Sequence, residues 1–158
     1  MKKKDYSFIT RWQIEAPIED VWNSIYESAD WPQWWKGVEQ VEIIQENDAT
    51  GINGIRKYTW KSVLPYTLSF QMKLVEKIDR KLLRGIAFGE LEGEGTWHFK
   101  EENGITKVQY HWNVKTNKAW MNHFAFILKP IFKFNHNIVM RWGSEGLAKK
   151  LNAPLIKD

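Results

Sequence analysis

The sequence contains no cysteine among its 158 residues, which excludes disulfide bonds, a thiolate nucleophile and cysteine-ligated metal. Its four histidines are scattered without the spacing of a zinc site, so we expect neither a metal nor a cofactor. Internal repeats, low-complexity segments and linker-like stretches are also missing. Because a chain of this length has about the size of one domain, we expect residues 1–158 to form a single domain.

A long apolar run free of charge is missing as well. Met1 is followed by three lysines, as at the start of a signal peptide, but no apolar segment comes after them. The segment 120–142 is long enough to cross a bilayer, but it contains Lys129, Lys133 and Arg141, each of which is costly in hydrocarbon. We therefore expect a cytoplasmic protein in which this segment is a water-exposed helix.

Acidic residues are scarce in the last part of the chain. The whole sequence has a net charge of +4, but residues 117–151 contain six cations and a single acid, Glu145, and thus a net charge of +5. A basic helix of this kind attracts phosphates, anionic lipid headgroups or an acidic partner, unless it is only a solvated flank. Because its basic residues are spread and no nucleic-acid-binding motif accompanies them, we expect no nucleic-acid partner.

What the sequence does contain is a clear succession of alternating and helical patterns. They predict a strand, two short helices, six strands and a long C-terminal helix, in this order. The first strand is expected at 6–15, the short helices at 17–28 and 30–37, the six strands at 38–46, 54–61, 66–78, 81–89, 94–101 and 105–116, and the long helix at 117–152.

The best-defined pair of strands is the last one. The Asn-Gly dipeptide at 103–104 is the strongest short hairpin signal, and as a two-residue turn it pairs Glu102 with Ile105. Counting back from this turn places Trp97 opposite Tyr110, so that apolar side chains meet on one face. Turn and register agree, which predicts an antiparallel hairpin.

The long helix is expected to be interrupted only by Pro130. Apolar residues three or four positions apart predict its core-facing stripe, namely Trp120, Phe124, Ile127, Ile131, Phe134, Ile138 and Trp142. The opposite side collects polar residues, namely Asn122, Lys129, Lys133, His136, Asn137 and Arg141. Phe126 and Met140 also fall on this side, and they are too few for a membrane-insertion face, so we expect little membrane binding.

Five segments add a resemblance to these patterns: APIEDVW at 16–22, DWPQWWKGV at 30–38, LPY at 64–66, GELEGEGTW at 89–97 and NHNIVM at 135–140. Together with the order of elements, they resemble small bacterial single-domain members of the START or Bet v 1-like superfamily, also described as polyketide cyclase/dehydrase and lipid transport proteins. The resemblance covers nearly the whole chain. It implies an α+β helix-grip fold, in which a curved antiparallel sheet of about seven strands wraps around the C-terminal helix, with two short helices between the first two strands.

The resemblance also implies a tunnel between the concave side of the sheet and the C-terminal helix. Pockets of this type are mostly apolar, with a few polar groups that orient the ligand. Strand and helix parity select the candidate ligand-binding residues: Trp12, Arg56, Tyr58, Trp60, Phe70, Met72, Trp97, Tyr110, Trp112, Phe124, Ile127, Ile131 and Asn135. The alternative is that these side chains fill one another's space as a solid core.

Three polar residues need a separate interpretation. Arg56 shares the parity of two aromatic residues, and it must pair with a carboxylate or carbonyl of the protein or ligand unless it reaches solvent at the strand end. If it meets the ligand, Arg56→Leu is expected to weaken an anionic or carbonyl-bearing ligand by about 1.5–3 kcal/mol. Asn135 falls on the apolar side of the last helix and needs hydrogen-bond partners, whereas His136 falls on the polar side and is expected in water.

Three classes of function remain open. The first is binding or transport of a hydrophobic small molecule, either a lipid or a polyketide-like aromatic. The second is a cyclase or dehydratase-like enzyme acting on a ketide, and the third is an interaction module that uses the basic helix. The sequence shows no nucleophile and base at the spacing of a known catalytic motif, so we rank ligand binding first. We assign no catalytic residue, and whether the protein is an enzyme stays open. A membrane partner is not favoured, and no obligate protein partner is evident.

Overall fold

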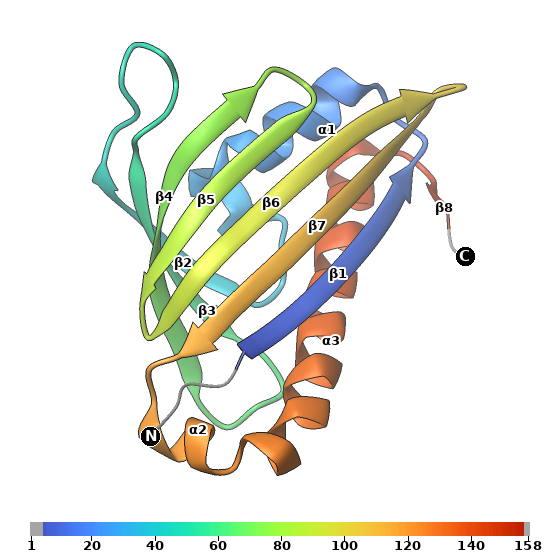
Figure 1. The fold of residues 1–158 in the computed structure, drawn as a ribbon. Coiled ribbons are helices and arrows are strands. Elements are labelled where there is room, and N and C mark those ends of the chain that lie inside the picture. Colours follow the sequence, from blue (N-terminus) through green and yellow to red (C-terminus); the bar gives the residue numbers. More distant parts are fainter. Residues whose placement is uncertain (1–4, 157–158) are drawn as a thin grey trace.

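The alternating segments form one antiparallel sheet in the computed structural model, which describes residues 5–156 (Figure 1). Its strands are β1 (Asp5–Ile14), β2 (Val38–Gln45), β3 (Ile55–Lys61), β4 (Thr67–Ile78), β5 (Leu82–Gly89), β6 (Leu91–Glu102), β7 (Ile105–Thr116) and β8 (Leu155–Ile156). They follow the spatial order β2-β3-β4-β5-β6-β7-β1-β8. The N-terminal strand therefore lies beside β7, and the hairpins from β2 to β7 make up the rest of the curved sheet.

The helices lie on the concave side of this sheet and at its two ends. They are α1 (Ile18–Tyr26), the 3-10 helix η1 (Ser28–Gln33), α2 (Ala119–His123) and α3 (Ala125–Leu151). Figure 1 shows α3 running along the sheet, with α1 at one end of the molecule and α2 at the other. This is the expected α+β helix-grip architecture.

The sheet contains one strand more than the sequence predicts. The additional strand, β8, consists of two residues, of which Ile156 pairs with Gln13 and Leu155 with Ile14 of β1. Two residues are too few to show an alternating pattern, so β8 has no signal in the sequence. The strand β6 also begins at Leu91, earlier than the predicted position 94.

The predicted hairpin between β6 and β7 is confirmed. Glu102 pairs with Ile105 and Trp97 with Tyr110, as expected from a two-residue turn. Both turn residues have positive φ, 52° at Asn103 and 78° at Gly104, which is the backbone of a type I′ turn. This local chemistry sets the register of the two strands that carry much of the concave face.

The C-terminal helix is broken at a different place from the one predicted. Phe124, with φ −100° and ψ 19°, separates α2 from α3. Pro130 instead lies inside α3, close to its start, and is exposed. A proline there removes one backbone hydrogen bond, and the helix continues past it.

The side of α3 that faces the core is also not the predicted one. Most of the predicted stripe is exposed, with exposed fractions of 46% at Trp120, 47% at Phe124, 52% at Ile127, 43% at Ile131 and 64% at Phe134. The residues turned toward the sheet and the short helices are instead Phe132, His136, Val139, Met140, Gly143 and Leu147. Asn122 and Met140, which were placed on the polar side, are buried, and Phe126 is 82% exposed.

Two glycines on α3 explain which of its sides is covered. Gly143 lies against the indole of Trp35, and a Cβ there would come within 2.5 Å of Cε2. A Cβ on Gly146 would collide with the carbonyl oxygen of Trp34. Trp35 also donates a hydrogen bond of 2.9 Å from Nε1 to the carbonyl of Val139. Because these tryptophans can approach only the glycine side of α3, the more apolar stripe turns toward solvent.

Among residues 5–156, none of the helices combines the length and the hydrophobicity needed to cross a bilayer.

Candidate functional site

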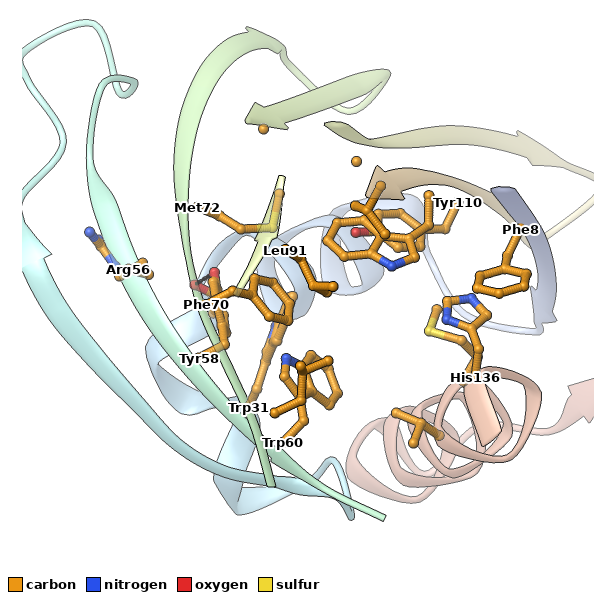
Figure 2. A pocket seen from close by; sticks show the side chains of 18 of the residues that line it. Phe8, Trp31, Arg56, Tyr58, Trp60, Phe70, Met72, Leu91, Tyr110 and His136 are labelled. Atoms are coloured by element: carbon orange, nitrogen blue, oxygen red, sulfur yellow. Dashed lines mark hydrogen bonds between the residues drawn. The ribbon is translucent and has the colours of Figure 1, made fainter. Parts of the chain in front are cut away.

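A cavity of about 220 Å³ lies between the concave face of the sheet and α3 (Figure 2). It is larger than the ~150 Å³ cavity that binds benzene in an engineered protein, and smaller than the ~300–1,000 Å³ of typical ligand pockets. Its wall is formed by residues from strands and helices on both sides, namely β1, β3, β4, β5, β6, β7, α1, η1, α2 and α3. The space therefore lies between the sheet and the helices and is partly open to the outside.

Aromatic side chains of the sheet form one wall of this cavity. Phe70 of β4 lies 5.4 Å from Trp112 of β7 between ring centroids, and Tyr110 lies 5.9 Å from Trp112. Tyr58 pairs with Phe70 across β3 and β4, and their rings lie 6.2 Å apart. Tyr58 and Phe70 point to the same face because they are paired, and Tyr110 and Trp112 do so because they are two positions apart on one strand. The contact between Phe70 and Trp112 reaches across β5 and β6.

Two glycines create room in the middle of the sheet. Gly85 of β5 and Gly95 of β6 are paired across the two strands, are buried, and line the cavity. A Cβ on Gly85 would lie 2.9 Å from the terminal methyl carbon of Met72, and one on Gly95 would collide with the hydroxyl of Tyr110. The missing side chains thus leave the space that Met72 and Tyr110 occupy.

The end of the cavity beside η1 is closed by packed indoles. The cluster comprises Trp12, Trp31, Trp35, Trp60 and Trp97, with neighbouring ring centroids 4.8 to 6.3 Å apart. Tilted and edge-on contacts at these distances are favourable beyond simple burial. The sequence left open whether the aromatic residues line a tunnel or fill a solid core. Part of them, the tryptophan cluster, packs as solid core at this end of the cavity, and the others surround the cavity.

Three polar groups of the wall are held by the protein itself. The hydroxyl of Tyr58 donates a 2.8 Å hydrogen bond to Ser28 Oγ, and burial raises the pKa of this tyrosine. The guanidinium of Arg56 donates a 2.8 Å hydrogen bond to the carbonyl of Gln45, and the Arg56 side chain is 16% exposed. In Figure 2 Arg56 lies at the edge of the cavity, away from its aromatic centre.

The opposite part of the wall contains a half-buried histidine. His136 of α3 stacks on Phe8 of β1, with ring centroids 4.6 Å apart and planes inclined by 23°. The hydroxyl of Thr10 lies 3.4 Å from Nε2 of His136, and among the residues that the structure describes Nδ1 has no hydrogen-bond partner. Burial lowers the pKa of His136 to about 4, so the imidazole is neutral at physiological pH.

The expectation that His136 lies in water is therefore wrong. The prediction placed it opposite the apolar stripe, but packing of the tryptophans on Gly143 turns this side of α3 inward. Asn135 also lines the cavity, and its Oδ1 accepts a 2.5 Å hydrogen bond from Ser62 Oγ in the connection between β3 and β4. This bond ties the loop to α3.

Two donors of the wall lack hydrogen-bond partners. The hydroxyl of Tyr6 and the indole N–H of Trp60 are buried, and neither has an acceptor among the described residues. Leaving a buried donor unpaired costs about 1–3 kcal/mol. A molecule that supplies an acceptor beside them recovers part of this free energy.

Nine of the thirteen residues selected from the sequence line the cavity, namely Arg56, Tyr58, Trp60, Phe70, Met72, Trp97, Tyr110, Trp112 and Asn135. Four do not. Trp12 is buried in the tryptophan cluster, where it packs on Trp35 and Trp97. Phe124, Ile127 and Ile131 lie on the exposed side of the C-terminal helices, for the reason given above.

Sequence reasoning missed several residues of the wall, including Phe8, Ser28, Trp31, Phe132, His136 and Met140. A signal existed for Phe8, because it shares the inward parity of Tyr6 and Trp12 on β1. For the residues of α3 the only signal is the pair of glycines at 143 and 146, which marks a side where another segment approaches closely.

Known structures resemble this fold closely while their sequences differ. A START superfamily protein from Mycobacterium smegmatis has a TM-score of 0.74 at 10% identity, with 93% of this chain and 97% of that chain covered. The Zhui aromatase/cyclase from Streptomyces sp. R1128 has a TM-score of 0.73 at 10% identity, with 94% of each chain covered.

A third similar structure is the di-domain ARO/CYC BexL from the BE-7585A biosynthetic pathway, with a TM-score of 0.73 and 18% identity. The match covers 95% of this chain and 51% of BexL, so this chain spans about half of that protein. At such identities these likenesses show the fold alone. No curated protein matches the sequence.

A comparison of the sequence with protein families identifies the family of this chain, which the structural likenesses do not. Residues 14–133 match the family described as polyketide cyclase / dehydrase and lipid transport. The matched range includes β2 to β7, α1, η1 and the first part of α3, and thus most of the cavity wall. This chain belongs to the polyketide cyclase / dehydrase and lipid transport family.

Proposed function

We propose that this protein binds a small, mainly apolar molecule in the cavity between the sheet and α3. The observation that carries the proposal is the cavity itself: Met72 and Tyr110 pack against the paired glycines Gly85 and Gly95, and about 220 Å³ between the sheet and α3 stays unfilled.

The dimensions and chemistry of the wall favour a flat ring compound over a long acyl chain. If ~150 Å³ holds one benzene ring, 220 Å³ in this conformation suits roughly one or two fused rings. The rings of Phe70 and Trp112 offer faces and edges for stacking. The unpaired donors of Tyr6 and Trp60 favour a ligand that carries a hydroxyl or carbonyl oxygen.

A test uses the tryptophan fluorescence of the protein, native mass spectrometry and thermal denaturation. Titration with naphthol, a two-ring phenol, is expected to change the fluorescence and raise the melting temperature, whereas palmitate has a smaller effect. Gly95→Val, which forces the Tyr110 and Trp112 side chains toward the cavity, should abolish the response. The control is Thr96→Val, because Thr96 lies next to Gly95 and points to the convex face. An unchanged response in Gly95→Val contradicts this site, and the absence of any response to ring compounds or lipids contradicts the proposed function.

A second candidate function is catalysis on a ketide, and the imidazole of His136 in the cavity wall is the observation that favours it. A neutral imidazole accepts a proton, and burial raises the pKa of Tyr110, which keeps its hydroxyl protonated as a donor to a carbonyl. However, a base works best when its pKa lies near the working pH, and the pKa of His136 is about 4. This mismatch ranks catalysis second. Turnover of an aromatic ketide precursor that is lost in His136→Phe, while ligand binding persists, would promote it.

A further inference from the structure

The end of the molecule that carries α2 exposes an unusual amount of apolar surface. Its members come from α2, the start of α3 and the β3–β4 connection: Val63 (58% exposed), Trp120 (46%), Phe124 (47%), Phe126 (82%), Ile127 (52%), Ile131 (43%) and Phe134 (64%). We refer to these seven residues as the apolar tip. Single exposed apolar residues are common on soluble proteins, but a contiguous group of this kind marks a contact surface.

The residues of the apolar tip belong together in space. Phe124, Ile127, Ile131 and Phe134 are three or four positions apart, so they lie along one side of the helix. Phe126 lies in the same first turn but on the side that carries Lys129 and Lys133. Trp120 joins them to the β3–β4 connection, because its ring lies 5.7 Å from that of Tyr66 in an edge-on contact. Figure 1 shows α2 and the start of α3 together at the end opposite α1.

The charge around the apolar tip has one sign. The stretch 117–143 contains four cations and no acidic residue. Lys118 is paired with Glu90 at 3.2 Å, but among the residues that the structure describes Lys129 and Lys133 have no ion pair. The ammonium of Lys129 lies 5.7 Å from the ring centre of Tyr6. Two uncompensated lysines thus accompany exposed aromatic and aliphatic side chains.

We propose that the apolar tip docks onto the surface of an anionic lipid bilayer. Side chains such as Trp120 and Phe126 enter the boundary between headgroups and acyl chains, while Lys129 and Lys133 interact with acidic headgroups. A surface-bound helix needs an apolar side and flanking cations, and it does not need the length of a membrane-spanning segment.

A second copy of the chain fits this surface less well. Most homodimers have twofold symmetry, so the same patch would meet itself and bring the lysines of both copies together. Like charges facing each other across an interface are unfavourable, whereas an anionic bilayer neutralises them. Charge complementarity therefore selects the lipid surface.

Docking at this end also bears on the cavity, a step that rests on the proposed function. Ser62, Leu64 and Tyr66 of the β3–β4 connection and Met121 of α2 line the cavity, and they lie in the same elements as the apolar tip. A docked molecule therefore presents this end of the cavity to the bilayer. An apolar ligand then passes between membrane and protein without crossing water.

The test is co-sedimentation of the protein with vesicles of phosphatidylcholine containing about 30% phosphatidylserine, compared with phosphatidylcholine alone. Binding is expected with the anionic vesicles, and it weakens severalfold when NaCl is raised from about 0.1 M to about 0.5 M. The double variant Phe126→Ser/Phe134→Ser is expected to bind at least about tenfold more weakly, and Lys133→Glu about fivefold more weakly.

Matched controls change the same residue types elsewhere. Ile43→Ser/Ile44→Ser removes exposed apolar side chains from β2, and Lys149→Glu reverses a charge in the last turn of α3. Both controls should bind vesicles like the wild type. All variants are first compared with the wild type in melting temperature, because the substituted side chains are exposed and the fold should persist.

Each result decides between docking and another role for the tip. Equal binding of the wild type and the double phenylalanine variant, or no binding to anionic vesicles, overturns the proposal. A wild type that is dimeric in analytical ultracentrifugation, becomes monomeric in the phenylalanine variant and ignores vesicles identifies the tip as a self-interface instead. If vesicle binding holds but no small molecule enters the cavity, the proposed function fails and docking stands.

Discussion

Gly85 and Gly95 stand opposite each other on β5 and β6, and both face the same interior cavity. On their two sides, Met72 and Tyr110 reach into the space that glycine side chains leave free. A larger side chain at either position would push Met72 or Tyr110 toward the cavity and reduce its volume. Neither glycine has a positive φ, so the backbone conformation does not require glycine at these positions. A substitution at Gly85 or Gly95 is therefore expected to change the cavity without straining the backbone.

The two glycines should differ in how they tolerate a methyl group. Gly95→Ala is expected to displace the Tyr110 hydroxyl and to destabilise the fold by about 1–3 kcal/mol, as overpacking does. Gly85→Ala should cost less, because the nearest atom is the flexible end of Met72. Urea denaturation of both variants measures the difference. A larger loss of stability in Gly85→Ala would contradict the geometry of the cavity.

Stability should depend on pH through His136. The pKa of His136 is lowered from 6.5 to about 4 by burial, so between these values the unfolded chain binds a proton that the folded protein does not. The contribution of His136 is complete above about pH 6.5 and is lost as the pH falls toward 4, by up to about 3 kcal/mol. Urea denaturation at about pH 7.5 and about pH 5 measures it.

The variant His136→Phe should remove this pH dependence, because phenylalanine keeps the stacking on Phe8 without a titrating group. His123→Gln serves as the control, since it removes an exposed histidine of α2 that does not line the cavity. A slope that persists in His136→Phe would assign the dependence to another group.

Gly143→Ala should destabilise the protein although alanine is the better helix former. The intrinsic gain is about 1 kcal/mol, but the new Cβ would lie 2.5 Å from the indole of Trp35 and force this indole away from α3. We expect a net loss of about 1–3 kcal/mol in the free energy of unfolding. Asn137→Ala, on the exposed side of the same helix, should be neutral or stabilising. Equal effects of the two changes would mean that the close contact does not determine the rotation of α3.

Arg56→Leu should lower stability rather than ligand affinity. The guanidinium already donates to the carbonyl of Gln45 and lies 3.8 Å from a carboxylate oxygen of Glu46, so it is anchored at the edge of the cavity. Its loss is expected to cost about 1.5–3 kcal/mol of unfolding free energy, the range of a hydrogen bond to a charged group. Calorimetric titration with a ring ligand should give an unchanged dissociation constant. A tenfold weaker dissociation constant with intact stability would restore Arg56 as a ligand contact.

Much of the sheet was predictable because its determinants are local. The alternation of side chains assigns the faces of each strand, and the Asn-Gly turn at 103–104 places Trp97 opposite Tyr110. This explains why the strand residues of the wall, such as Phe70 and Trp112, could be selected without coordinates. The resemblance to a known superfamily supplied the way in which sheet and helix combine.

The rotation of α3 was decided only by tertiary structure. Its sequence has apolar residues on two sides, and helical periodicity cannot tell which side the sheet covers. The close approach of Trp35 to Gly143, across more than a hundred positions of the chain, turns His136 toward the cavity and leaves Phe124, Ile127 and Ile131 in solvent. Patterns along a chain determine the faces of its elements, but which face is buried depends on the long-range contacts that pack most closely.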